Sequence, residues 1–281
     1  MVQLGKLFSP AENLDAGEAK KFMAEHPEGS YILLDVRQPA EYEEEHLAGA
    51  RLIPLGQLGD AVTELPKDKP IITYCAIGGR SRVAAQLLQG YGFQKVYNLK
   101  GGIKAWQGYK ASGPEELHLD LVRGDETPAE VAKLAMGMEE SLKKFYQTLL
   151  TTATDGEVRA LFEKMVEVSE LHKRRFGDFL EQWEPGRKRV DTAAEVETEI
   201  MEGGYNLKEF LEKNGPYMET LPGALDVAMM LETQALDLYR RLAERAEVAG
   251  TRDFLMQVSQ EEKVHLNLLG DLLEAKVKAG G

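Results

Sequence analysis

The chain has 281 residues, a single cysteine and a formal net charge of −13, and this length favours two domains. One cysteine excludes a disulfide within the chain and any zinc site built from several cysteines. The acidic balance argues against a nucleic-acid partner, and no segment is long and apolar enough to cross a membrane, so we expect a cytoplasmic protein.

The charge is distributed unevenly along the chain. Residues 1–113 hold 13 basic and 13 acidic side chains, whereas residues 114–281 hold 21 against 34, which accounts for the whole −13. Residues 111–126 contain Gly, Pro and charges without a helical or strand period. We therefore predict one domain over 1–113, a linker over 114–126 and a second domain over 127–281.

In the first hundred residues short apolar runs alternate with helical patterns, which predicts a parallel α/β sheet. The strands are expected at 4–8, 31–36, 51–53, 71–75 and 95–99. The helices are expected at 15–25, 39–44, 58–65, 81–90 and 102–107.

From Thr127 to the end the pattern is helical, and a capping box with proline at the first helical position opens it at Thr127-Pro-Ala-Glu130. Long helices are expected over about 128–150, 155–182, 222–248 and 251–278. Short linkers within each pair predict two antiparallel hairpins, and a long crossover joins the pairs. The crossover carries two helix-start signals, Thr192-Ala-Ala-Glu195 and Asn206-Leu-Lys-Glu209. A four-helix bundle with one long crossover is the ferritin-like topology.

Cys75 opens a loop between a predicted strand and a predicted helix, with the sequence Cys75-Ala76-Ile77-Gly78-Gly79-Arg80-Ser81. The two glycines allow a tight turn whose backbone N–H groups point inward, and the helix adds its positive end. Arg80 adds full charge, with Arg82 as a further candidate. Each effect favours a thiolate over a thiol. We therefore predict Cys75 and Arg80 as catalytic and the other loop residues as substrate-binding; a small buried cysteine at a strand end is the alternative.

These residues and several others resemble the rhodanese family over about 1–110. The resemblance rests on Leu34-Asp35-Val36-Arg37, Glu41, His46, Gly49-Ala50, Cys75 to Arg80, and Gly101-Gly102-Ile103-Lys104-Ala105-Trp106. It implies transfer of sulfane sulfur through a Cys75 persulfide, from thiosulfate or a persulfide to a thiol or cyanide acceptor. It also implies that Asp35 and Arg37 are mainly scaffold.

Loop length separates this chemistry from its nearest rival. Phosphatases with a cysteine nucleophile hold a tetrahedral phosphate in Cys-x5-Arg, whereas the spacing from Cys75 to Arg80 is Cys-x4-Arg. The smaller cradle suits a sulfurtransferase. Phosphatase or arsenate reductase activity is the less favoured alternative.

Within residues 127–281 a phrase of three side chains occurs twice, 93 residues apart. The first copy is Glu139, Tyr146 and His172, and the second is Glu232, Tyr239 and His265. In each copy Glu and Tyr lie about two helical turns apart and share a face, and Glu262 shares a face with His265 three residues later. One Glu from each of two helices, with Glu-x-x-His from each of two others, is the ligand set of a di-iron bundle.

This helical region resembles the rubrerythrin branch of the ferritin-like family over about 127–278. The resemblance implies as metal ligands Glu139, His172, Glu232, Glu262 and His265. It implies iron, as a pair or as a single ion, with zinc or manganese as alternatives. The chain lacks a Cys-x-x-Cys pair, so electrons would have to come from an external donor.

The phrase is broken at Ser169, which occupies the position that matches Glu262. Glu170 lies about 100° round the helix and is a poor substitute. Either the site binds less metal, or another group such as Glu170 or a carboxylate of the crossover supplies the ligand. Tyr146 and Tyr239 either hydrogen-bond the ligating carboxylates or are core aromatics. The bundle is then either a redox centre or a dimerisation and docking module, and we expect a homodimer through it.

Overall fold

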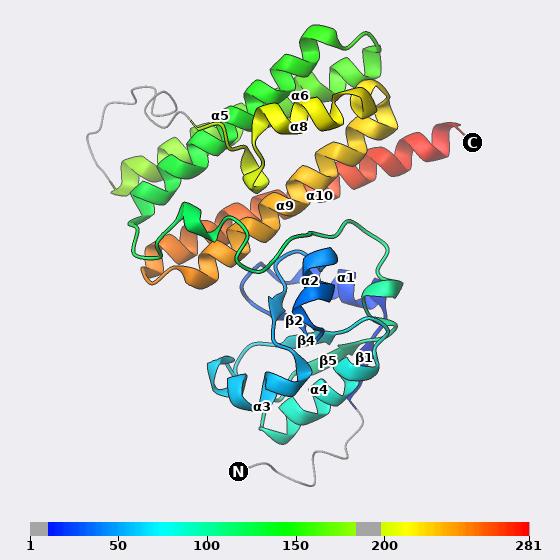
Figure 1. Ribbon diagram of the computed structural model, residues 1–281, viewed down its shortest axis with the longest axis vertical. Coiled ribbons are helices and arrows are strands. Elements are labelled where there is room, and N and C mark those ends of the chain that lie inside the picture. The colour runs from blue at the N-terminus through cyan, green and yellow to red at the C-terminus, as the bar shows by residue number, and fades with distance from the viewer. Residues whose placement is uncertain (1–10, 184–197, 281) are drawn as a thin grey trace. The chain divides into compact units, whose positions relative to one another are not determined.

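The computed structural model describes residues 11–183 and 198–280, which form two compact units that divide between Leu117 and His118 (Figure 1). The division falls within the segment predicted as a linker. The predicted strand at 4–8 and the helix signal at Thr192 lie outside the described residues.

The first unit is built on a parallel sheet with the strand order β1-β5-β4-β2-β3. The strands are β1 Glu12–Leu14, β2 Ile32–Asp35, β3 Arg51–Leu52, β4 Ile71–Tyr74 and β5 Val96–Leu99. The helices are α1 Ala16–Glu25, α2 Pro39–Glu44, α3 Leu58–Ala61 and α4 Gly79–Gly90. This arrangement confirms the predicted parallel α/β class.

Both faces of this sheet are covered, which explains why its central strand is an apolar run. Ile71 packs in one core with residues of α3 and α4, and Ile72 packs in the other with residues of α1 and α2. Successive side chains of a strand point to opposite faces, so a strand buried on both sides needs consecutive apolar residues. β4 therefore lies inside the unit, and its carboxyl end places Cys75 at one edge of the sheet.

The second unit is a bundle of long helices, as the helical pattern predicts. Its four long helices within the described residues are α5 Pro128–Thr152, α6 Gly156–Trp183, α9 Leu221–Arg245 and α10 Ala249–Gly280. The Thr127 hydroxyl accepts a hydrogen bond from the Glu130 N–H and the Glu130 carboxylate accepts one from the Thr127 N–H, so the predicted capping box is present. α5 pairs with α6 and α9 with α10, which confirms the two hairpins and the ferritin-like class.

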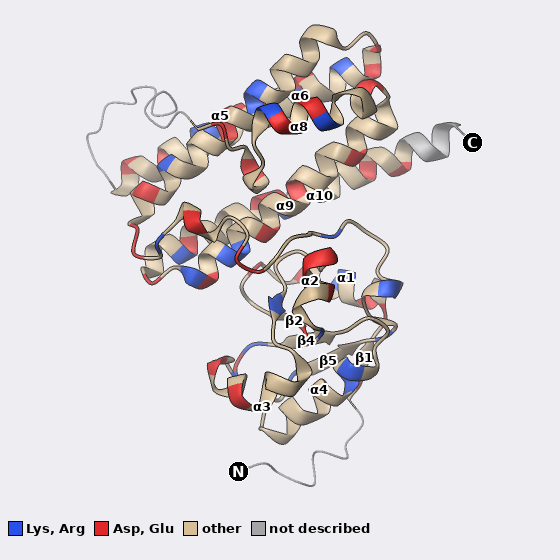
Figure 2. Ribbon diagram, in the orientation of Figure 1, with Lys and Arg blue, Asp and Glu red and all other residues tan. Residues whose placement is uncertain are grey.

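Acidic and basic residues are interspersed along these helices (Figure 2). Several of them form ion pairs: Lys143 contacts Glu140 within α5 and Glu170 on α6, each at 2.7 Å, and Lys173 on α6 contacts Glu140. Among the described residues, no helix is long and apolar enough to cross a membrane.

The crossover returns to the bundle before α9. Its described portion contains a 3-10 turn at Glu202–Gly204 and the helix α8 Leu207–Asn214, whose first turn is capped by the Asn206 side chain as predicted. The 3-10 turn packs against α9 and α5, so this stretch of the crossover belongs to the bundle interior.

Candidate functional site

Cys75 follows β4, and its loop turns directly into α4. Gly78 is the N-cap of α4 and has a φ of +92°, a left-handed conformation that glycine adopts without strain. Of the predicted loop residues Gly78 and Ser81 are buried, Ala76 and Arg80 are half-buried, and Ile77 and Gly79 are exposed. The two ends of the loop, Cys75 and Ser81, are therefore buried, and Ile77 and Gly79 are exposed on either side of the buried Gly78.

The Cys75 sulfur lies inside this loop and accepts hydrogen bonds. The Gly78 N–H donates to Sγ over 3.1 Å and the Ser81 hydroxyl over 3.4 Å. Burial opposes ionisation of the thiol, but hydrogen bonds from the Ser81 side chain and from the backbone N–H groups of Ser81, Ile77 and Gly78 outweigh it. They hold the pKa of Cys75 below its usual value. The loop is therefore built to favour a thiolate.

The segment at Gly101 and Gly102 packs against the backbone of the Cys75 loop. Gly102 has a φ of +61°, and a Cβ there would lie 2.1 Å from the Cys75 carbonyl oxygen. The chain after Gly102 bonds to the same loop, because the Ile103 N–H donates to the Cys75 carbonyl over 2.8 Å. Only a residue without a side chain permits this close approach of two backbones.

Arg80 contacts a carboxylate that the sequence did not assign to the site. Its two terminal nitrogens donate to the two oxygens of Glu41, both over 2.7 Å. The hydrogen bond from Arg80 lowers the pKa of Glu41 to about 2. Glu41 also accepts from the Gln38 N–H at the start of α2, so the pair connects the Cys75 loop to α2.

Two other arginines of the first unit, Arg37 and Arg82, have different surroundings. Arg37 forms a buried ion pair with Asp35 at 2.7 Å and donates to the Glu45 carbonyl, which fits the scaffold role implied by the resemblance. Arg82 is exposed and lines a cavity of about 150 Å³ together with Asn98, Lys100 and the loop residues Ile77 and Gly78; Cys75 itself is not among its lining residues.

In the second unit the five predicted ligands converge from four helices. Glu139 lies on α5, His172 on α6, Glu232 on α9, and Glu262 and His265 on α10. The Glu139 carboxylate lies 3.2 Å from His172 Nδ1, and the Glu232 carboxylate lies 3.6 Å from His265 Nδ1. The two imidazole rings stack with centroids 4.4 Å apart.

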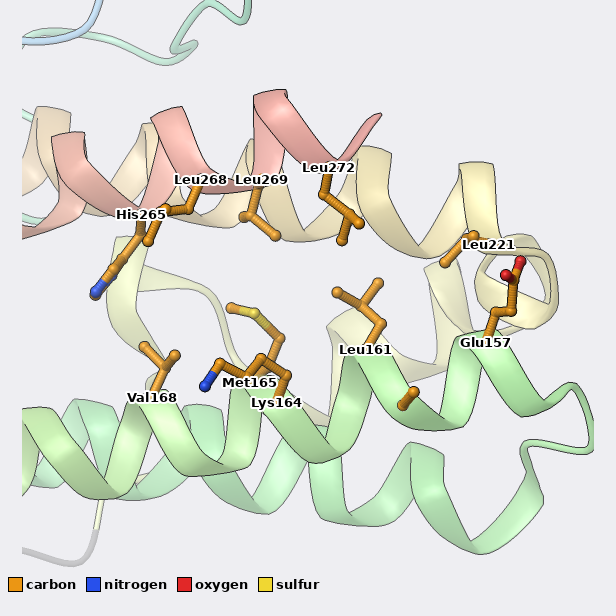
Figure 3. A pocket seen from close by; sticks show the side chains of 11 residues that line it. Glu157, Leu161, Lys164, Met165, Val168, Leu221, His265, Leu268, Leu269 and Leu272 are labelled. Carbon is orange, nitrogen blue, oxygen red and sulfur yellow. The ribbon is translucent and has the colours of Figure 1, made fainter. Parts of the chain in front are cut away.

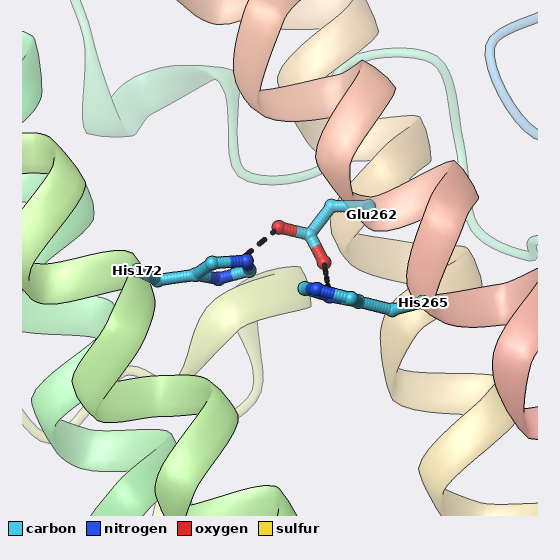
Figure 4. A group of neighbouring side chains, drawn as sticks. All are labelled: His172, Glu262 and His265. Carbon is cyan, nitrogen blue, oxygen red and sulfur yellow. Dashed lines mark ion pairs between the residues drawn. The ribbon is translucent and has the colours of Figure 1, made fainter.

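Glu262 lies between the two histidines, and each of its oxygens faces one of them (Figure 4). Oε1 is 3.8 Å from His172 Nδ1, and Oε2 is 3.6 Å from His265 Nδ1. The other nitrogen of His172, Nε2, faces Glu261 at 3.8 Å, and Arg175 contacts Glu261 at 3.2 Å. A carboxylate behind an imidazole is how metal-binding histidines are commonly oriented.

The ligand atoms of this cluster suit a cation because several of them have no hydrogen-bond partner in the part of the chain that the structure describes. Among the described residues, the two Glu262 oxygens, Glu232 Oε2 and His265 Nδ1 are buried and have no hydrogen-bond partner. Burial, followed by the charges of nearby carboxylates, raises the pKa of Glu262 well above its usual range. Buried carboxylates without partners are costly, and divalent cations are their usual complement.

Comparison with known proteins identifies both units. A family model for rubrerythrin matches residues 130–273, and a model for the rhodanese-like domain matches residues 15–109. The chain belongs to the rubrerythrin family. It carries a rhodanese-like domain ahead of its rubrerythrin domain, and both resemblances are confirmed.

The individual relatives match the rhodanese-like domain. The uncharacterized protein YqhL of Bacillus subtilis is 50% identical over 76 residues, which are 27% of this chain and 60% of YqhL. Thiosulfate sulfurtransferase GlpE of Coxiella burnetii is 37% identical over 78 residues, 28% of this chain and 73% of that protein. The crystal structure of a rhodanese-related protein from Thermoplasma volcanium is 29% identical with a TM-score of 0.31, over 34% of this chain and 89% of that one.

The rubrerythrin domain also contains a carboxylate that sequence reasoning did not name. Among the described residues, two groups of three side chains offer ligand atoms within 4.8 Å of one another: His172, Glu262 and His265, and Glu139, His172 and Glu202. Glu202 lies in the crossover and is 2% exposed. The only signal in the sequence is an acidic residue before two glycines, which is too common to find a ligand.

The sequence also pointed to Ser169, Glu170 and two tyrosines near the proposed ligands, and the structure gives each of them different surroundings. Ser169 is buried and its hydroxyl bonds the Glu139 carboxylate. Glu170 pairs with Lys143 on the outer side of α6. Tyr239 donates to Glu202, whereas the Tyr146 hydroxyl is buried and has no hydrogen-bond partner among the described residues.

A groove between α6 and α10 of the rubrerythrin domain ends at His265 (Figure 3). Its volume is about 450 Å³, and mainly apolar side chains line it, among them Leu161, Met165, Val168 and Leu269. His265 is the polar group on its wall that also faces the carboxylates. Lys164 and Glu157 are the charged side chains that line the groove, and apart from them and His265 its lining is apolar, which suits the approach of an uncharged molecule.

Proposed function

We propose that the rhodanese-like domain is a sulfurtransferase that works through a persulfide on Cys75. The observation that carries the proposal is the Cys75 loop, where hydrogen bonds from Gly78 and Ser81 favour the thiolate. The names of two relatives support it: GlpE is a thiosulfate sulfurtransferase, and a protein of Allochromatium vinosum that is 37% identical over 75 residues is a sulfurtransferase.

The reaction takes place in two displacements at sulfur. The Cys75 thiolate attacks the outer sulfur of thiosulfate, the sulfur–sulfur bond of the donor breaks, and sulfite leaves with the electron pair. A thiol or cyanide acceptor then attacks the outer sulfur of the Cys75 persulfide, and the Cys75 thiolate leaves. The loop N–H groups that bond Sγ would also stabilise the terminal persulfide charge.

Replacing the nucleophile tests this mechanism. Because Cys75 is the only thiol, Cys75→Ser should abolish both thiocyanate formation from thiosulfate and cyanide and the gain of one sulfur atom in the intact protein mass. Val83→Ala, at an exposed position of α4, is the matched control and should keep both. Substantial transfer by Cys75→Ser would rule the persulfide out.

The rival phosphatase hypothesis is weaker in the structure. A phosphatase of this type needs a free arginine fork to hold the phosphate, whereas both terminal nitrogens of Arg80 bind Glu41. The spacing and the pairing both argue against a phosphatase.

We propose that the rubrerythrin domain binds iron and has a redox role. Glu139, His172, Glu232, Glu262 and His265 would hold the metal, and the unpaired buried oxygens support this assignment. When bound, iron supplies one-electron chemistry suited to reducing a peroxide with electrons from an external donor. The apolar groove at His265 would admit such an uncharged substrate.

The alternative is a docking bundle without chemistry. The expected homodimer through the bundle stays a proposal under either hypothesis. It is supported by exposed apolar side chains on α10, of which Leu268 is 62% and Val264 47% exposed. Light scattering of the purified protein measures the oligomeric state, and metal analysis of the same sample separates a metal centre from a docking module.

A further inference from the structure

Because Ser169 stands at the position that matches Glu262, α6 contributes His172 but no carboxylate to the ligand cluster. Ser169 and Glu202 both hydrogen-bond the Glu139 carboxylate, so the two side chains face the same region of the cluster. Glu202 reaches this point from the crossover, not from a long helix of the bundle.

The carboxylate of Glu202 is held deep among the other ligands. It offers an oxygen within 4.8 Å of ligand atoms of both Glu139 and His172, and it accepts a hydrogen bond from Tyr239 on α9. The residue is 2% exposed, and the preceding Met201 is fully buried. An acidic side chain in such a place needs a compensating charge.

Two glycines follow Glu202 and let the crossover turn pack closely inside the bundle. Gly203 and Gly204 have φ of +80° and +85°, and a Cβ on either would meet packed neighbours. At Gly203 it would lie 3.0 Å from Gln234 Cβ, and at Gly204 it would lie 2.1 Å from the His118 ring. A backbone bond from the Met201 N–H to the Tyr205 carbonyl over 2.8 Å closes the turn. The turn thus fits between α9 and the His118 ring only because both positions are glycine.

Charge gives an independent argument for two cations. Glu139, Glu202, Glu232 and Glu262 carry four negative charges when ionised, and two divalent cations carry four positive ones. Within the residues that the structure describes, the ion-pair contacts of these carboxylates are with His172 and His265, and none is with a lysine or an arginine. Glu139 and Glu202 have internal hydrogen bonds, whereas Glu232 Oε2 and both Glu262 oxygens have none among the described residues.

We propose that Glu202 is a metal ligand, so that a carboxylate of the crossover takes the place that Ser169 leaves empty and completes a six-ligand site for two divalent cations. This inference rests on the proposal that the rubrerythrin domain binds iron. It makes the crossover a component of the metal site, so metal binding would fix the turn at Glu202–Gly204 to the bundle.

The test is the amount of iron bound per chain. Chelator-stripped full-length protein is loaded with ferrous iron under anaerobic conditions, freed of excess and analysed for metal. We expect about two ions in the wild-type protein and about half of that, or less, in Glu202→Gln. Glu199→Gln, an exposed position of the same segment, is the control and should match the wild type.

A relocated carboxylate separates loss of a ligand from loss of folding. Ser169→Glu combined with Glu202→Gln restores one carboxylate on α6, and iron should return to about the wild-type amount. Ser169→Glu alone should not raise the iron content, because Glu202 already occupies the place. If Ser169 were a true gap, the wild type would hold about one ion and Ser169→Glu alone would raise that number.

The outcomes distinguish the two proposals. If the wild type binds no iron, the proposed role of the rubrerythrin domain fails and this inference fails with it. If the wild type and Glu202→Gln both hold two ions, only the assignment of Glu202 is wrong. A further outcome is that Glu202→Gln loses iron while the double variant is folded by circular dichroism but does not recover iron. In that case Glu202 does not take the place of a carboxylate at position 169, and that part of the proposal is wrong.

Discussion

Arg80 acts on the Cys75 loop through Glu41 as much as through its own charge. Both terminal nitrogens are bound to the Glu41 carboxylate, and Glu41 also holds the first turn of α2 through the Gln38 N–H. The pKa of Arg80 is raised first by this hydrogen bond and only to a lesser degree by Cys75. The sequence predicted an arginine aimed at the anionic donor, whereas the structure has an arginine that fastens the loop.

This geometry predicts the behaviour of Arg80→Lys. Lysine keeps the charge but cannot form the two-pronged contact with Glu41. We expect turnover to fall by about tenfold, and by the same factor with thiosulfate and with a neutral alkyl persulfide, because the lost function is support of the loop.

Steady-state rates with the two donors measure this. Arg51→Lys, which alters an ion pair between β3 and Glu64, is the matched control and should leave both rates unchanged. A loss confined to thiosulfate would mean that Arg80 leaves Glu41 during turnover and binds the donor oxygens.

Some of these residues could be predicted from the sequence and others could not. Cys75 and Arg80 lie in one short loop, and the helical ligands follow a repeat set by helix geometry. Glu41 lies 39 residues from Arg80, and no spacing rule connects them. Glu202 lies in an irregular turn, where no period places a side chain, and its partners come from three different helices.

Among the elements, those with a strong period or a cap were predicted closely. α2 and α5 begin where Pro39 and the Thr127 cap place them, and β4 follows its apolar run. β1 was missed because its three residues, Glu12–Leu14, are mostly polar and gain strand structure only by pairing with β5. Such a strand forms because a neighbouring strand pairs with it, and its own sequence pattern does not predict it.

The close approach of Gly102 to the Cys75 loop gives an element-scale prediction. In Gly102→Ala the new Cβ would meet the Cys75 carbonyl oxygen at 2.1 Å, and this oxygen belongs to backbone that cannot move as a flexible side chain would. We expect the rhodanese-like domain to lose roughly 1–3 kcal/mol of stability and persulfide formation to slow by about tenfold, because the loop shifts.

Gly92→Ala is the control, because Gly92 also has a positive φ, +96°, but its Cβ would meet nothing within 4 Å. It should lose only about 1 kcal/mol from the backbone conformation and keep its rate. Urea unfolding and single-turnover mass spectrometry compare the two. Equal rates in both variants would show that the contact behind Cys75 does not shape the loop.

The molecule as a whole joins two units whose stability can be followed separately. The chain has two tryptophans: Trp106 packs in the rhodanese-like domain, and Trp183 is the last residue of α6 in the rubrerythrin domain. In Trp106→Phe the fluorescence therefore reports the bundle alone. This is needed because a chain with two domains has no single free energy of unfolding.

The buried carboxylates predict how the metal-free bundle responds to pH. Burial raises the pKa of Glu139 from 4.5 to about 7 and raises the pKa values of Glu202 and Glu262 well above their usual range. Such groups keep their protons in the folded state while the unfolded chain releases them, so the stability that they contribute is greatest below about pH 4.5 and falls as the pH rises. Although burial opposes ionisation of Glu232, the nearby Glu262 and His265 lower its pKa, so Glu232 acts in the opposite direction. Glu139 alone contributes a loss on the order of 3 kcal/mol between pH 4.5 and 7.

Urea unfolding of chelator-treated Trp106→Phe protein at about pH 5 and pH 7.5, followed by Trp183 fluorescence, measures this loss. We expect a lower midpoint at the higher pH. Ferrous iron should reverse the trend, since the ligands must be deprotonated to bind it and binding then stabilises the folded state. Glu262→Gln removes one of the fully buried carboxyls and should weaken the pH dependence of the metal-free protein. If the metal-free midpoint instead stays constant or rises, the carboxylates already have compensating charge, and the argument that two cations balance them is wrong.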